Sequence, residues 1–183
     1  MNRIPIYNII LGGAAGIQVM SLVEFPAVES DFLAFSKEEQ KLNFSVDDEQ
    51  HIVFGCALRA DYPIYRVSPT NGEYYVVFSK ETIKQLYEKF LIEGKTSNVN
   101  LEHSTATEGV YLIQSFIKDK EKGINPKGFE DIADGSWFCA YKVMNDEVWK
   151  SIKEGSFNGF SVEVYCELEP ENEIEKLLDE LLD

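Results

Sequence analysis

The stretch Gly155-Ser156-Phe157-Asn158-Gly159-Phe160-Ser161-Val162-Glu163-Val164 places a serine inside an apolar run that follows a glycine turn. Successive side chains of a β-strand point to opposite faces, so Ser161 and Glu163 share one face while Phe160 and Val162 share the other. The run therefore predicts a strand with one apolar face in a core and one polar face directed away from it.

A second stretch, Asn98-Val99-Asn100-Leu101-Glu102-His103-Ser104, contains one of the two histidines of the chain. A serine hydroxyl is a poor nucleophile at neutral pH unless a base such as imidazole removes its proton. Because histidine is so scarce, the chain offers very few ways to build such a pair, and His103 with Ser161 is one of them. Each also has an ordinary explanation, as a solvated residue at a strand end and as a strand serine bonded to a neighbouring carbonyl.

The rest of the chain predicts a mainly β fold with peripheral helices (α+β), a mostly antiparallel β-barrel. Its 183 residues suffice for one domain with a buried core. Segments rich in Val, Ile, Phe and Tyr, bounded by turn residues, predict strands over 18–24, 32–35, 51–60, 73–78, 99–102, 110–118, 136–143 and 160–167. Residues 119–135 are expected to form a long surface loop, and residues 38–50 a weakly structured connection.

Helices are predicted at three places. Ser79 is a plausible N-cap for residues 80–93, and Asn145 for residues 146–154. A third helix follows Pro170, and its apolar stripe packs on the barrel, packs on a neighbouring chain or begins a coiled coil. We therefore divide the chain into a β-barrel domain, residues 1–169, and an acidic amphipathic C-terminal helix, residues 170–183.

Charge and cysteine usage exclude several classes of function. The formal net charge is −15, and residues 167–183 alone contain eight acids and one lysine, which opposes binding to nucleic acid. Residues 9–17 are apolar but short and broken by glycine, so a buried first strand is expected there, with neither a signal peptide nor a membrane span. The three cysteines fit neither a zinc site nor a disulfide framework, so reduced buried thiols, no metal and no cofactor are expected.

Several pieces of the chain, in a fixed order and spacing, resemble the phage prohead (capsid maturation) serine protease family, particularly its XkdF-like branch. The pieces are 98–103, 109–117, 135–143, 145–149 and 155–163, and residues 19–27 are similar to the N-terminal segment of that branch. The likeness covers most of the chain.

The resemblance implies the fold of the herpesvirus assemblins, a β-barrel with Ser161 as nucleophile and His103 as base on adjacent strands. His103 would remove the Ser161 proton, the alkoxide would attack a peptide carbonyl, and His103 would protonate the leaving amine. The implied substrates are phage scaffold and major capsid proteins and the chain itself. The implied location is the host cytoplasm, inside the assembling prohead, and a homo-oligomer remains an open alternative.

The third catalytic residue is left open by the sequence. Relatives place a histidine or an acid downstream of the serine, but no histidine follows Ser161. Glu163 shares a strand face with Ser161 and is the first candidate, with Glu102, Glu167 and Glu169 as alternatives. The gap also keeps two other functions open: a catalytically inactive virion structural or scaffolding protein, and a binding module unrelated to proteases.

Three further residues are expected to have no catalytic part. The sequence predicts that His51 is a surface residue among acids, and that Trp137 and Trp149 belong to the core.

Overall fold

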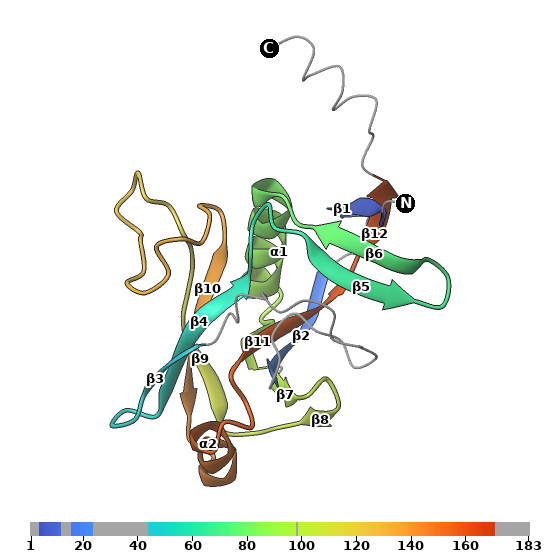
Figure 1. Ribbon diagram of the computed structural model, residues 1–183. Coiled ribbons are helices and arrows are strands. Elements are labelled where there is room, and N and C mark those ends of the chain that lie inside the picture. The colour runs from blue at the N-terminus through green and yellow to red at the C-terminus, as the bar shows by residue number, and fades with distance from the viewer. Residues whose placement is uncertain (1–3, 12–15, 24–43, 98, 171–183) are drawn as a thin grey trace.

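Three four-stranded sheets and two helices make up the computed structural model, which describes residues 4–11, 16–23, 44–97 and 99–170 (Figure 1). The first sheet has the order β12-β1-β6-β5 and the second β3-β4-β10-β9. The third, which we call the site sheet, has the order β11-β2-β7-β8. The strands are β1 (Ile6–Ile10), β2 (Gly16–Val23), β3 (Ser45–Asp47), β4 (Ile52–Leu58), β5 (Ile64–Ser68), β6 (Gly72–Val77), β7 (Val99–Leu101), β8 (Thr105–Ala106), β9 (Val110–Ile117), β10 (Trp137–Val143), β11 (Gly159–Tyr165) and β12 (Glu167–Pro170).

The mainly β class is confirmed, since 46% of the described residues are strand and 17% are helix. Strand pairs are antiparallel except β1–β6 and β2–β7, which are parallel. The closed barrel is not confirmed, because within the described residues the three sheets stay separate. Strands β11 and β4 lie close together without being paired in one sheet. The Phe160 ring of β11 lies against Gly55 of β4, where an added Cβ would be 3.6 Å from the ring.

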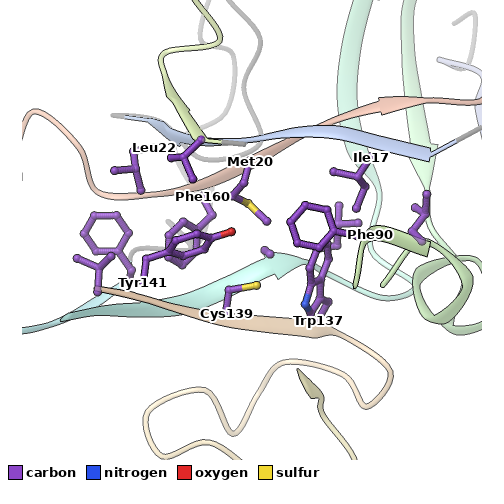
Figure 2. Close-up of a cluster of buried hydrophobic side chains, with 14 of the residues drawn as sticks. Ile17, Met20, Leu22, Phe90, Trp137, Cys139, Tyr141 and Phe160 are labelled. Carbon is purple, nitrogen blue, oxygen red and sulfur yellow. The ribbon is translucent and has the colours of Figure 1, made fainter. Parts of the chain in front are cut away.

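The core lies between the site sheet and the second sheet (Figure 2). Met20, Leu22 and Phe160 point from the site sheet toward Tyr141 and its neighbours on β10, and all four are at most 2% exposed. Alternation along β2 and β11 then directs the side chains between these residues to the opposite face of the site sheet. That opposite face carries the polar residues described below.

Helix α1 (Lys80–Ile92) packs on β2 and β10 and closes one side of this core. Ser79 accepts a hydrogen bond from Thr82 N at 3.1 Å, which confirms the predicted N-cap. Helix α2 (Asp146–Lys153) is capped by Asn145, whose side-chain oxygen accepts from two amides of the first turn. The short 3₁₀ helix η1 (Lys95–Ser97) leads from α1 to β7. The helix predicted after Pro170 lies outside the described residues.

Most predicted strands have an observed counterpart: β2, β4, β6, β7, β9, β10 and β11. The predicted strand 32–35 lies outside the described residues, and the predicted strand 160–167 is divided at Cys166 into β11 and β12. Strands β3, β5, β8 and β12 were not predicted as separate elements, and the first strand expected within residues 9–17 corresponds to β1, which begins earlier and ends at Ile10. No helix in the described part of the chain is long and apolar enough to cross a membrane.

Residues 119–135 are more than the surface loop that the sequence predicts. They fold over the outer face of the second sheet, where Phe129 packs edge-on against Phe54 and Phe138, and Ile132 is 5% exposed. The ammonium of Lys118 is buried and donates to the carbonyls of Phe129 at 2.7 Å, Glu130 at 3.1 Å and Ile132 at 2.5 Å. This buried charge, saturated with acceptors, holds the loop against the sheet.

Candidate active site

A row of three polar residues crosses the site sheet. Ser161 of β11 is the pairing partner of Ser21 of β2, and Ser21 is the partner of Asn100 of β7. Their immediate neighbours Phe160, Met20 and Leu22 face the core, so the three polar side chains lie on the opposite face. All three are nevertheless buried, with exposed fractions of 5%, 0% and 8%.

The turn between β7 and β8 brings His103 to this row. Glu102 and His103 have φ values of 49° and 55°, in the left-handed region, and Ser104 N donates to Leu101 O at 3.1 Å. Positive φ at both central residues is the pattern of a tight hairpin turn that glycine and asparagine usually fill. Such a backbone costs a non-glycine residue about 1 kcal/mol or more. The same turn is fixed to β2 by a hydrogen bond from Glu102 N to Leu22 O at 3.0 Å.

His103 makes two contacts through one ring nitrogen. Its Nδ1 lies 3.1 Å from Glu163 Oε1 and 3.0 Å from Ser21 Oγ. Asn100 Nδ2 donates to the same Glu163 Oε1 at 2.9 Å. The network thus joins β11, β2, β7 and the turn that follows β7.

These contacts determine which ring nitrogen can act as a base. An ionised carboxylate only accepts hydrogen bonds, so contact with Glu163 favours a proton on Nδ1. A neutral imidazole with its proton on Nδ1 has its lone pair on Nε2. His103 Nε2 is buried and has no hydrogen-bond partner in the described part of the chain. A carboxylate on one nitrogen and an available lone pair on the other is the arrangement of a general base.

Ser161 is not on a strand adjacent to the histidine hairpin, which corrects the expectation of adjacent strands. Strand β2 lies between β11 and β7, and two strand spacings correspond to about 10 Å. Within the described residues, no hydrogen bond joins Ser161 to His103, and the serine that does contact the imidazole is Ser21. The reason is topological: the parallel pairing of β2 with β7 inserts β2 into the middle of the sheet.

The acids proposed as the third catalytic residue are found in different places. Glu163 contacts His103, whereas Glu167 and Glu169 lie on β12 in the first sheet. Glu102 occupies the hairpin turn beside His103.

The other candidate nucleophiles and bases lie away from this network. Cys56 and Cys139 are free and buried; burial raises the pKa of Cys56 to about 12 and also raises that of Cys139, so both remain uncharged thiols at neutral pH.

His51 is partly buried and stacks on Trp149 with ring centroids 4.4 Å apart, so it is not the surface residue that the sequence predicts. Trp137 and Trp149 are core residues, as predicted. Among the described residues, no group of three or more His, Cys, Asp or Glu could hold a metal ion.

Comparison with known proteins places the chain in a family. A family profile described as "Putative phage serine protease XkdF" matches residues 40–169. The chain belongs to the XkdF family. The matched range includes Asn100, His103, Ser161 and Glu163, but not Ser21.

One relative in the XkdF family is the phage-like element PBSX protein XkdF of Bacillus subtilis (strain 168). It is 26% identical over 170 residues, which cover 88% of this chain. The chain spans 57% of the length of that relative. No solved structure matches this chain.

Sequence reasoning missed Ser21 and Asn100 as members of the site. Each is a polar residue inside a short apolar strand, as Ser161 is, and that signal could have selected them. What the sequence could not show is the pairing that aligns them, because β2 and β11 are separated by about three quarters of the chain.

Proposed function

We propose that this chain is a serine endopeptidase of phage head maturation that cleaves scaffold and capsid proteins, and itself, by an acyl-enzyme mechanism. The observation that carries the proposal is the environment of His103: Glu163 contacts Nδ1, and Nε2 is buried without a hydrogen-bond partner among the described residues. Membership of the XkdF family supports the serine protease class.

In the proposed mechanism His103 is the base, Glu163 its orienting acid and Ser161 the nucleophile. The Ser161 proton moves to Nε2 while the alkoxide oxygen attacks the peptide carbonyl, and the imidazolium is stabilised by Glu163. The same proton then passes to the leaving amine, which leaves an acyl-Ser161 ester. Water attacks this ester, and Nε2 takes its proton and returns one to Ser161.

Ser161 is preferred to Ser21 as nucleophile for three reasons. Ser21 faces Nδ1, the nitrogen that Glu163 already engages, whereas a nucleophile must face the lone pair on Nε2. Ser21 is 0% exposed, and Ser161 is 5% exposed. The family profile includes Ser161 and excludes Ser21.

A second candidate function is a catalytically inactive virion structural or scaffolding protein. Two observations favour it: Ser161 has no hydrogen bond to His103, and its side chain is almost fully buried. In that case the fold would serve contacts within the virion, and the row of Ser161, Ser21 and Asn100 would only stabilise the site sheet.

Coexpression with the cognate capsid and scaffold proteins separates the two candidates. Wild type is compared with Ser161→Ala, and Ser156→Ala is the matched control because Ser156 is exposed and lies five residues away in the same stretch. We expect capsid fragments, measured by intact mass, with wild type and Ser156→Ala but not with Ser161→Ala. Fragments that persist with Ser161→Ala would remove Ser161 as the nucleophile, and no fragments with any variant would favour the inactive protein.

A further inference from the structure

The Glu163 carboxylate that contacts His103 is also held by Asn100. Asn100 Nδ2 lies 2.9 Å from Oε1, the same oxygen that lies 3.1 Å from His103 Nδ1. Asn100 is on β7, three residues before His103, and Glu163 is on β11, so this hydrogen bond reaches across β2. Oε1 of Glu163 therefore accepts hydrogen bonds from two groups, the Asn100 amide and the His103 imidazole.

Without a second donor the Glu163 carboxylate would be poorly fixed. Its side chain is 36% exposed, so water competes with His103 for the carboxylate oxygens. A buried amide donor restricts the rotation of the carboxylate, because a hydrogen bond to a charged acceptor is short and directional. Asn100 is 8% exposed, and its donor is directed at Oε1 and not at solvent.

A purely structural role explains Asn100 poorly. Its side-chain oxygen Oδ1 is buried and has no hydrogen-bond partner within the described residues. A buried polar atom without a partner reduces stability, so an apolar side chain would suit the fold of β7 better. The unpaired Oδ1 therefore indicates that the role of the Asn100 side chain lies in its amide nitrogen Nδ2, which donates to Glu163.

We propose that Asn100 is a positioning residue for His103: it fixes the Glu163 carboxylate against Nδ1 and thereby keeps the neutral imidazole in the tautomer with its proton on Nδ1. This tautomer presents the lone pair of the buried Nε2. The inference rests on the proposed function in one respect, that Nε2 is the base that activates Ser161. The tautomer itself is a property of the resting protein.

Nitrogen NMR of protein labelled with ¹⁵N-histidine tests the inference without substrate. The chain contains only two histidines, and His51, stacked on Trp149, is an internal reference in every spectrum. Spectra are recorded near pH 8, where imidazoles are largely neutral, for wild type, Asn100→Ala and the control Asn71→Ala, whose residue is exposed at the β5–β6 turn. We expect the Nδ1–H tautomer of His103 to predominate in wild type and in the control, and the Nε2–H population to rise in Asn100→Ala.

Kinetics of a cleaved capsid peptide provide the second measurement. Asn100→Ala should lower kcat roughly 10- to 100-fold, the cost of a misplaced catalytic group, with little change in KM. The wild-type spectrum tests the proposal even if Asn100→Ala fails to fold, since a predominant Nε2–H tautomer in wild type would overturn it. An unchanged tautomer in folded Asn100→Ala would also overturn it. If the tautomer shifts but no variant cleaves, the positioning role stands and the protease proposal fails.

Discussion

Glu163 is the residue on which the account of the site depends most. By engaging Nδ1 of His103 it leaves Nε2 as the nitrogen that can accept a proton. Ser21 Oγ lies 3.0 Å from the same Nδ1. It therefore contacts the nitrogen that takes no part in the proposed proton transfer. The proposed roles of the two serines thus follow from Nδ1, which Ser21 and Glu163 already contact: the nucleophile must approach Nε2, which has no hydrogen-bond partner among the described residues.

Cys56 makes the stability of the protein sensitive to alkaline pH. Burial raises the pKa of this thiol from 9.0 to about 12, whereas in the unfolded chain it ionises near its ordinary value. Between those two values the folded state keeps a proton that the unfolded state has lost. The free energy of unfolding should therefore be unaffected by Cys56 below about pH 9 and fall above it, by at most about 1.4 kcal/mol per pH unit.

Urea denaturation at a series of alkaline pH values, for wild type and Cys56→Ala, measures this contribution. We expect the free energy of unfolding to fall less above about pH 9 in Cys56→Ala than in wild type. At neutral pH the variant should be less stable than wild type, because the packing of the buried side chain is lost. Parallel pH profiles for the two proteins would show that Cys56 does not keep its proton in the folded state.

At the scale of elements, Lys118 is expected to be a major contributor to stability. It follows directly after β9, is 1% exposed and donates to three carbonyls of the 119–135 loop. Lys118→Met keeps the apolar part of the side chain and removes all three donors. We expect the free energy of unfolding to fall by roughly 2–4 kcal/mol, because buried carbonyls lose a charged donor.

The comparison variant for Lys118 is Lys120→Met, which changes an exposed lysine in the same loop. Surface substitutions usually change stability by less than about 0.5 kcal/mol. Urea denaturation of both variants at neutral pH gives the difference. Equal midpoints for Lys118→Met and Lys120→Met would mean that the loop does not depend on the buried ammonium.

Local signals in the sequence correctly predicted helices α1 and α2 and several strands. Ser79 and Asn145 cap the observed helices because a hydroxyl or amide oxygen satisfies free backbone donors wherever the helix begins. The 119–135 loop was harder, because its charges and glycines conceal the few apolar residues, Phe129 and Ile132, that fix it to the sheet. Short strands such as β8, with two residues, carry too little pattern to be predicted.

At the scale of the whole molecule, strand order is what the sequence could not supply. Periodicity correctly predicted that Ser161 and Glu163 share a polar face, and it proposed Glu163 as a candidate partner of His103. It could not show that β2 lies between β11 and β7, because pairing between distant segments leaves no local pattern. That order brings Ser21 to the imidazole and separates Ser161 from it by a strand.

The central claim, that Ser161 is a nucleophile activated by His103, is tested most directly by covalent labelling. An activated serine oxygen attacks the phosphorus of a fluorophosphonate probe and displaces fluoride, which leaves a stable phosphonyl ester on the serine. The labelled residue is identified by peptide mass spectrometry in wild type, Ser161→Ala, Ser21→Ala, His103→Ala and the control Ser156→Ala. Our account predicts an adduct on Ser161 in wild type, Ser21→Ala and Ser156→Ala, and none in Ser161→Ala or His103→Ala. An adduct on Ser21, or no adduct on folded wild-type protein, would contradict it.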